Sequence, residues 1–239
     1  MKLSEKNYKT WNEIEFLEQL LRLDGKSILD LGCGKAEITR LIATNGDDRK
    51  VTAAEVDETQ HSKNLLIDDL PNVTFIKSGS ELIPLEDESI DVAFMFKSLH
   101  HVPMSLMNNA FNEVKRVLKP GGFVYISEPV YDGEFNDLLS LFHDEKIVRQ
   151  AAYNAINKSV SDKSLSMVDE IFINIPKFYK NFEEFKSLVI NVTYADHKLS
   201  PELFQKVKEK FSLNMDEDGK RFLQPIRINL IQKKSKQQT

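Results

Sequence analysis

Short hydrophobic runs alternate with helical patterns through the first half of the chain. The strand-sized runs lie at 27–31, 51–55, 73–76, 91–96 and 123–127. The clearest helical pattern between them repeats every three or four residues, at Leu106, Met107, Ala110, Phe111, Val114 and Leu118. Alternation of this kind is typical of βαβ units. We therefore predict an α/β fold with a doubly wound, mostly parallel sheet.

After Glu128 the pattern changes. A long helical periodicity covers 135–158, an aromatic-rich segment interrupted by Pro176 covers 172–185, and Ile226, Ile228 and Leu230 alternate as in a closing strand. We predict five parts along the chain: an N-terminal helical cap at 1–24, a core at 25–130, a helical insertion or lid at 131–180, a C-terminal completion of the core sheet at 181–233, and a disordered tail at 234–239.

Composition narrows the class of protein. The 239 residues are 41% hydrophobic and 29% charged, which excludes a disordered chain, and no apolar run approaches the roughly 20 residues of a membrane span. The formal charge of −5 argues against a general nucleic-acid binder. A single cysteine, Cys33, excludes an internal disulfide, and no segment resembles a signal peptide. We expect a cytoplasmic protein without membrane association.

The segment Asp30-Leu31-Gly32-Cys33-Gly34 follows the first predicted strand and opens a helix. Glycines here allow a ligand to approach the backbone closely, and the helix N-terminus offers a partial positive charge. A dinucleotide-binding fingerprint would require glycine at position 37, where Glu37 stands. The turn therefore favours a less anionic nucleoside over NAD(P), and a tight turn without a ligand is the alternative.

The second predicted strand ends in Glu55-Val56-Asp57. A carboxylate at this position, beside the glycine turn, can accept hydrogen bonds from both hydroxyls of a ribose. We favour Glu55 because it directly ends the strand, with Asp57 as the reserve. A solvated acidic turn is the alternative.

Several segments resemble the motifs of class I S-adenosylmethionine-dependent methyltransferases, most closely those of type 11. They are Ile28–Gly34 for the first motif, Pro84-Leu85 with Ser89-Ile90-Asp91 before the fourth strand, Leu99-His100-His101-Val102 after it, and Glu113–Gly122 for a helix with its "LKPGG" turn. Together they cover about residues 25–130. The resemblance implies a Rossmann-like fold and S-adenosyl-L-methionine as the cofactor.

The resemblance also implies roles for single residues. The implied cofactor contacts are Asp30, Gly32, Cys33 and Gly34 at the methionine end, Glu55 at the ribose, Val56 at the adenine, and Lys97 with Ser98 after the fourth strand. Gly79 stands where the family usually has an aspartate for the adenine amino group, so Ser78 or Ser80 would supply that contact. Ala36 replaces the third glycine-like position of the first motif.

Tyr8 and Trp11 precede the first helix, where this family often folds a segment over the cofactor. Their rings could meet a sulfonium by cation–π attraction, and core packing is the alternative. His100 and His101 follow a strand at its carboxyl end, where open α/β sheets bind ligands, and either could act as a general base. We favour His100. Glu128, at the end of the fifth strand, is the third catalytic candidate, and capping or packing of the loops is the alternative for all three.

These observations predict a methyltransferase that uses S-adenosyl-L-methionine to methylate an oxygen, nitrogen or carbon atom of a small-molecule acceptor, without a metal. A protein or RNA methyltransferase and a catalytically silent cofactor-binding or scaffolding protein are the alternatives. Aromatic residues of the predicted insertion could enclose an apolar or planar acceptor, although ordinary packing explains them equally well. They are Tyr131, Phe135, Phe142, His143, Tyr153, Phe172, Phe178 and Tyr179.

Overall fold

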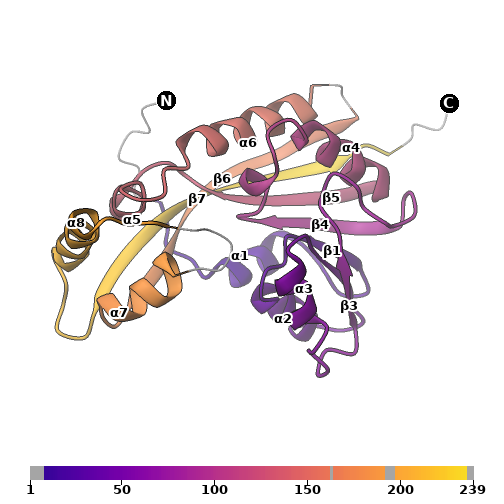
Figure 1. Cartoon of the computed structure of the whole chain (residues 1–239). Coiled ribbons are helices and arrows are strands. Elements are labelled where there is room, and N and C mark those ends of the chain that lie inside the picture. Colours follow the sequence, from indigo (N-terminus) through magenta and orange to yellow (C-terminus); the bar gives the residue numbers. More distant parts are fainter. Residues whose placement is uncertain (1–7, 162–163, 192–196, 236–239) are drawn as a thin grey trace. The chain divides into compact units, whose positions relative to one another are not determined.

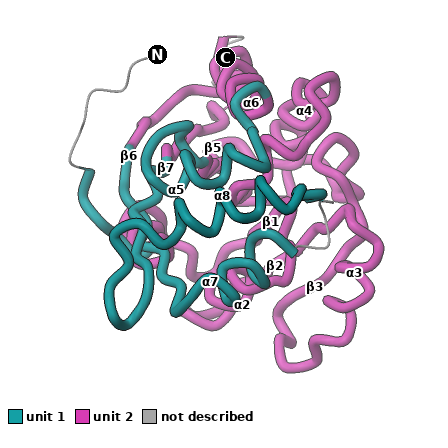
Figure 2. The backbone as a smooth tube through the Cα atoms, turned by 60° about the vertical axis from the view of Figure 1, so that its left-hand side comes forward, with its two compact units in different colours: residues 1–12, 129–147, 172–226 teal, residues 13–128, 148–171, 227–239 magenta. Residues whose placement is uncertain are grey.

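The structure is a computed structural model that describes residues 8–161, 164–191 and 197–235 (Figure 1). The chain divides into two compact units (Figure 2). Unit 1 comprises 1–12, 129–147 and 172–226, and unit 2 comprises 13–128, 148–171 and 227–239. Residues 1–7 of the predicted cap and 236–239 of the predicted tail lie outside the described residues.

A seven-stranded sheet forms the centre of unit 2, and its last two strands continue along the chain into unit 1. The strands are β1 (Ser27–Leu31), β2 (Lys50–Glu55), β3 (Val73–Lys77), β4 (Ile90–Phe96), β5 (Leu118–Pro129), β6 (Leu165–Tyr179) and β7 (Lys220–Lys233). Their order is β3-β2-β1-β4-β5-β7-β6, and the pairs from β3 to β5 are all parallel. The predicted doubly wound, mostly parallel sheet is therefore confirmed.

β7 runs antiparallel to β5. Near one end of the pair the Lys233 side chain donates to Leu118 O, and near the other end Val130 N–H donates to Pro225 O at 2.9 Å. Since β7 is the neighbour of β5 in the sheet, the backbone bond places Val130 opposite Pro225 at that end of the pair.

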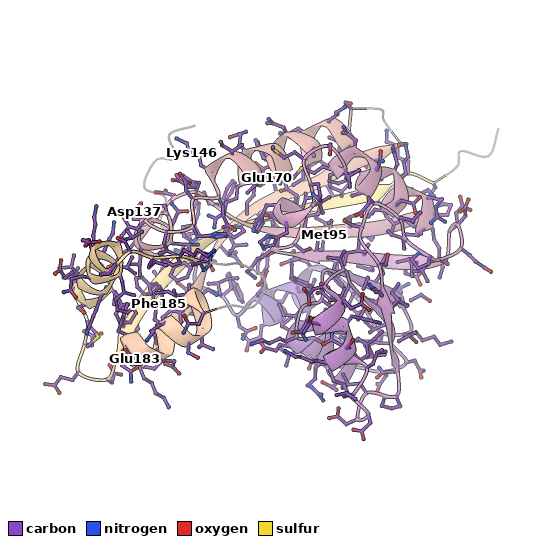
Figure 3. The ribbon with its side chains drawn as sticks, in the orientation of Figure 1. Met95, Asp137, Lys146, Glu170, Glu183 and Phe185 are labelled. Carbon is purple, nitrogen blue, oxygen red and sulfur yellow. The ribbon has the colours of Figure 1, made fainter. Side chains whose placement is uncertain are left out.

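Helices cover the sheet of unit 2. They are α1 (Glu13–Leu20), α2 (Glu37–Thr44), α3 (Glu58–Asn64), the short turn η1 (Leu99–His101), α4 (Met107–Val117) and most of α6 (Lys146–Ser159). α4 buries the apolar stripe that its sequence predicts, in one core with Ala152, Ala155 and Ile156 of α6. Figure 1 shows α6 along β6 and α4 over β5, and Met95 of β4 is labelled in Figure 3.

Unit 1 has its own aromatic core. Its helices are α5 (Glu134–Leu139), α7 (Phe182–Phe185), the π-helical turn η2 (Lys186–Ile190) and α8 (Pro201–Ser212). Phe135, Tyr179, Phe182, Phe185, Phe211 and Phe222 are all buried there. Within the part of the chain that the structure describes, no helix is both long and apolar enough to cross a bilayer.

The helical insertion predicted at 131–180 differs from the structure in its last third, because Leu165–Tyr179 is strand β6. The sequence did not predict this strand because it contains Pro176, and proline cannot donate a hydrogen bond to a neighbouring strand. β6 lies at the edge of the sheet, where proline is tolerated. Moreover, the structure places 172–226 in a single unit, across the boundary predicted between 180 and 181.

The predicted "LKPGG" turn, Leu118–Gly122, is not a loop before the fifth strand. β5 already begins at Leu118, which pairs with Ile90 of β4. The register then shifts, so that Val92 pairs with Phe123, and Gly121 absorbs the irregularity with φ of +81°. The proline and the two glycines thus form a bulge inside a strand.

Candidate functional site

The glycine turn after β1 is held against the end of β2. The N–H groups of Gly32 and Cys33 both donate to Ala54 O, at 2.9 and 3.0 Å. Gly32 has φ of +76°, and a Cβ at this position would lie 2.6 Å from the Ser98 Cβ. Position 32 therefore requires glycine both for its backbone conformation and for the close approach of the segment after β4.

Glu55 lies directly against this turn. Its Oε2 accepts a hydrogen bond from Gly34 N–H at 2.8 Å, and its Oε1 accepts one from Asp57 N–H at 2.9 Å. Each carboxylate oxygen can accept a further bond, which is what two ribose hydroxyls require. Asp57 instead accepts from Gln60 N–H and caps α3, so the geometry favours Glu55 over Asp57. Val56, between them, is 64% exposed, as a residue that lies against an adenine would be.

Asp30 is buried beneath the turn. Its Oδ2 accepts a hydrogen bond from the Thr39 hydroxyl at 2.6 Å, whereas its Oδ1 is buried without a hydrogen-bond partner among the described residues. Burial raises the pKa of Asp30 to about 6; the bond from Thr39 opposes this rise and the charge of Glu55 adds to it. A buried acceptor oxygen without a donor fits the cationic amino group at the methionine end of the cofactor.

Two further residues shape the turn. Burial raises the pKa of the Cys33 thiol, and the negative charges of Asp30 and Glu55 add to this effect, so the thiol stays protonated and neutral. Asn64, at the end of α3, donates from Nδ2 to Gly34 O at 2.8 Å. The sequence did not identify Asn64, because α3 is almost entirely polar and shows no apolar periodicity.

The segment after β4 also lies beside the turn. Ser98 donates from Oγ to Leu31 O at 2.7 Å, and Lys97 has φ of +54° with its N–H donating to Ser127 O at 2.7 Å. The Lys97 ammonium pairs with Glu13, a buried residue that also accepts a hydrogen bond from the Ser127 hydroxyl. Glu13 was missed, although its position four residues before the buried Leu17 on α1 was a signal that it faces inward.

The loop after β3 carries the residues predicted for the adenine. Ser78 N–H donates to Glu55 O at 3.1 Å, which joins this loop to the ribose residue. The Ser78 hydroxyl lies 2.8 Å from both Gly79 O and Leu82 O, and Ser80 is buried. A Cβ at Gly79 would meet only the flexible carboxylate of Glu81 at 2.4 Å. The backbone conformation at position 79 therefore does not require glycine.

His100 and Glu128 form a buried pair. His100 Nδ1 is hydrogen-bonded to Glu128 Oε2, and Leu99 N–H donates to Glu128 Oε1 at 3.0 Å. His101 is exposed, with its ring centroid 4.1 Å from that of His100. His100 Nδ1 is held by the Glu128 carboxylate, which would position the ring. Their chemical roles remain predictions.

Tyr8 and Trp11 belong to unit 1. Tyr8 stacks on Phe172, with ring centroids 5.3 Å apart, and Trp11 N–H donates to Asn174 O at 3.0 Å. Both contacts run along β6. Their predicted contact with the cofactor therefore stays a prediction.

The comparison with protein families identifies the segment that carries this turn. Residues 29–126 match the family model described as a methyltransferase domain. This segment is a methyltransferase domain. The match covers β1 to β5, and so it includes the glycine turn, Glu55, Lys97 and His100.

Curated relatives are similar to part of this chain. An uncharacterised methyltransferase of Mycobacterium tuberculosis is 32% identical over 108 residues, which cover 45% of this chain and 42% of that protein. The sterol 24-C-methyltransferase of Candida albicans is 25% identical over 190 residues, covering 69% of this chain and 48% of that protein. The chain spans half or less of the length of these relatives.

Solved structures share the fold at low sequence identity. A putative methyltransferase of Bacillus halodurans superposes with a TM-score of 0.65 at 17% identity, covering 93% of this chain and 99% of that one. The [4+2]-cyclase SpnF superposes with a TM-score of 0.60, also at 17% identity, covering 93% and 80%. These likenesses concern the Rossmann-like fold alone.

Proposed function

We propose that this protein transfers a methyl group from S-adenosyl-L-methionine to a small-molecule acceptor. The observation that carries the proposal is the Glu55 carboxylate, held at the tip of β2 against the N–H of Gly34 in the glycine turn. A carboxylate in this position would accept hydrogen bonds from both hydroxyls of a ribose, beside a turn whose glycines would admit a ligand close to the backbone. The match of 29–126 to the methyltransferase domain supports the same reading.

Different residues at and near the turn would contact different parts of the cofactor. Asp30 would receive the methionine amino group on its Oδ1, and Gly32 and Gly34 leave room for the methionine end. Glu55 would hold the ribose, while Val56 and the loop 78–80 would contact the adenine. When bound, the cofactor supplies an electrophilic methyl group on a positively charged sulfur.

The His100–Glu128 pair would remove a proton from the acceptor. His100 Nδ1 is hydrogen-bonded to Glu128, and we assign the role of the base to Nε2 of the same ring. A positioned base contributes roughly 10²–10⁴-fold to the rate. Holding the acceptor in line with the methyl group contributes about 7–11 kcal/mol, so positioning is the larger effect.

A small acceptor fits the charge of the protein better than a nucleic acid does. The formal charge of −5 argues against general binding to a phosphate backbone. Relatives named as a sterol 24-C-methyltransferase and as a phthiotriol/phenolphthiotriol dimycocerosates methyltransferase also support a non-polymeric acceptor. We place the protein in the cytoplasm, as its single cysteine suggests.

A second function, cofactor binding without methyl transfer, is favoured by one observation. Gly79 has no side chain to receive the adenine amino group, which would weaken the hold on the cofactor. The structural neighbour named as a [4+2]-cyclase is a case of other chemistry on this fold. Release of S-adenosylhomocysteine from S-adenosylmethionine in a metabolite extract separates the two functions, because the silent protein would release none.

Thermal unfolding with S-adenosylmethionine, S-adenosylhomocysteine and NAD tests the cofactor. A ligand at 100 times its Kd stabilises a protein by about 2.7 kcal/mol. At this chain length that corresponds to a rise in Tm of roughly 5–10 °C. We expect the rise with the two sulfur nucleosides and not with NAD, and a folded sample without it would contradict the proposal.

Glu55→Ala and Asp57→Ala form a matched pair for the same measurement. Glu55→Ala should remove most of the rise in Tm. Asp57→Ala should keep the rise but lower the baseline stability by about 1 kcal/mol, because it removes the N-cap of α3. The reverse pattern would make Asp57 the ribose residue.

A further inference from the structure

Arg227, on the part of β7 that belongs to unit 2, is held rigidly from two sides. Its Nε donates to Asn229 Oδ1 at 2.9 Å, and its guanidinium carbon lies 4.1 Å from the centre of the Tyr153 ring. Asn229 is fixed in turn, because its Nδ2 donates to Glu170 Oε2 at 2.9 Å. Glu170 is labelled in Figure 3. The plane of the guanidinium group is therefore set before any ligand arrives.

Among the described residues, no acceptor is hydrogen-bonded to the two terminal nitrogens of Arg227. Over residues 8–161, 164–191 and 197–235, no carboxylate forms an ion pair with this guanidinium. Arg49 and Arg116, by contrast, each pair with two carboxylates. Arg227 is also partly buried, which lowers its pKa, while the charges of Glu170 and Glu128 and the hydroxyl of Tyr153 oppose that effect. A partly buried cation without an ion-pair partner costs free energy, so it marks a position where an anion would be stabilised.

The strand register places Arg227 beside the His100–Glu128 pair. Val130 N–H donates to Pro225 O across the antiparallel strands β5 and β7. Counting from this pair two residues back along β5 and two residues forward along β7, Glu128 lies opposite Arg227. Residues that lie opposite each other on neighbouring strands share one face of the sheet. Glu128 is itself engaged by Leu99 N–H and by His100, and Glu170 by Asn229.

We propose that the terminal nitrogens of Arg227 bind a carboxylate group of the methyl acceptor, while Tyr153 supports the guanidinium from behind. This inference rests on the proposed function, since it adds a chemical class to the acceptor. The planar fork of an arginine matches the two oxygens of a carboxylate. Two carboxylates already stand near this arginine, so a ligand with a single negative charge is favoured over a doubly charged phosphate.

NMR of the arginine side-chain Nε–H groups tests the site in the full chain with S-adenosylhomocysteine present. Arg227→Lys assigns the signal by removing it. We expect acetate and benzoate, titrated into the millimolar range, to shift the Arg227 signal to saturation, and the uncharged ethanol and benzyl alcohol to leave it in place. An unmoved signal with both carboxylates overturns the inference, and so does a shift with inorganic phosphate but with neither carboxylate.

Arg221 provides the matched control. It lies on β7 as well, 4.9 Å from the centre of the Phe178 ring, but it pairs with Asp216 and Asp218. Its signal should not respond to acetate, and Arg221→Gln should leave the Arg227 response intact. Equal responses of both arginines would indicate nonspecific anion binding and overturn the inference.

Turnover gives a second readout. For a carboxylated acceptor, Arg227→Gln should raise KM at least tenfold and leave the Kd of S-adenosylhomocysteine unchanged; an unchanged KM overturns the inference. The two proposals fail differently. A wild-type protein that binds no S-adenosylhomocysteine contradicts the proposed function, whereas one that binds it while Arg227 ignores carboxylates contradicts only the acceptor class.

Discussion

Gly32 and Gly34 both have positive φ, but their surroundings differ. A Cβ at Gly32 would lie 2.6 Å from the Ser98 Cβ, whereas a Cβ at Gly34 would meet no described atom within 4 Å. Gly34→Ala thus carries only the backbone penalty of about 1–2 kcal/mol. We expect Gly32→Ala to cost about 1–3 kcal/mol more because of overpacking. Urea unfolding of the two variants measures the difference in stability. Equal losses of stability would show that the Ser98 side chain moves aside without an energetic cost.

Asp30 should make the stability of the protein depend on pH. Its pKa is about 6 in the folded protein, above the ordinary value of about 3.9, so the folded state binds a proton more readily than the unfolded chain. The free energy of unfolding contributed by Asp30 is therefore highest below pH 4, falls as the pH rises to about 6, and is constant above it. The fall amounts to about 3 kcal/mol as an upper figure.

Asp30→Asn separates this effect from those of other groups. At pH 7 we expect the variant to be more stable than the wild type without a ligand, and to bind S-adenosylhomocysteine more weakly because it lacks the carboxylate. Denaturant unfolding at pH 4, 5, 6 and 7 gives the comparison. A stability difference between variant and wild type that does not change with pH would contradict the assignment.

At the scale of elements, α1 is connected to the ends of β4 and β5 through Glu13. We expect Glu13→Gln to weaken the binding of S-adenosylhomocysteine about tenfold, or about 1.4 kcal/mol. The reason is that Lys97, held with positive φ beside the glycine turn, would lose its ionic partner. Calorimetric titration measures the Kd.

Glu15→Gln is the control, because Glu15 is also in the first turn of α1 but is exposed. It alters the charge at the helix N-terminus equally and should leave the Kd unchanged. A double-mutant cycle with Lys97→Met completes the experiment, since coupled residues give non-additive changes in Kd. Additive changes would mean that Glu13 acts on the helix and not on Lys97.

Most elements of unit 2 were predictable, because β1, β2 and β4 bury apolar runs and α4 buries a regular stripe. Local pattern failed where tertiary context decides the structure. α3 reads ETQHSKN and has no apolar face, and β6 contains Pro176 at an edge that only the strand order reveals.

Some residues of the candidate site were likewise predictable from the sequence, and others were not. Glu55 was predictable because it ends a strand next to the glycine turn in sequence order. The bond between His100 and Glu128 joins positions 28 residues apart, and the pair of Glu13 and Lys97 joins positions 84 apart. No local spacing encodes such contacts, so they appear only once the parallel strands are aligned.

For the whole molecule, hydrogen exchange shows where a ligand acts. We expect S-adenosylhomocysteine to slow exchange at 30–36, 55–57, 78–80 and 97–98, the segments that carry the predicted contacts. Residues 8–12 test the predicted contacts of Tyr8 and Trp11, which belong to unit 1. Slower exchange there would support those contacts, and unchanged exchange would remove both residues from the site.

Consecutive residues of a strand point to opposite faces, and the end of β5 applies this to Ser127 and Glu128. Ser127 contacts Glu13 of α1, whereas Glu128 holds His100 and lies across from Arg227. The Ser127 side chain thus contacts a residue that positions the proposed cofactor site, and the Glu128 side chain contacts the residues proposed for the acceptor. Substitutions at Arg227 or Tyr153 can therefore change the preferred acceptor while the machinery for the methyl donor is inherited intact, which leaves the two specificities free to evolve separately.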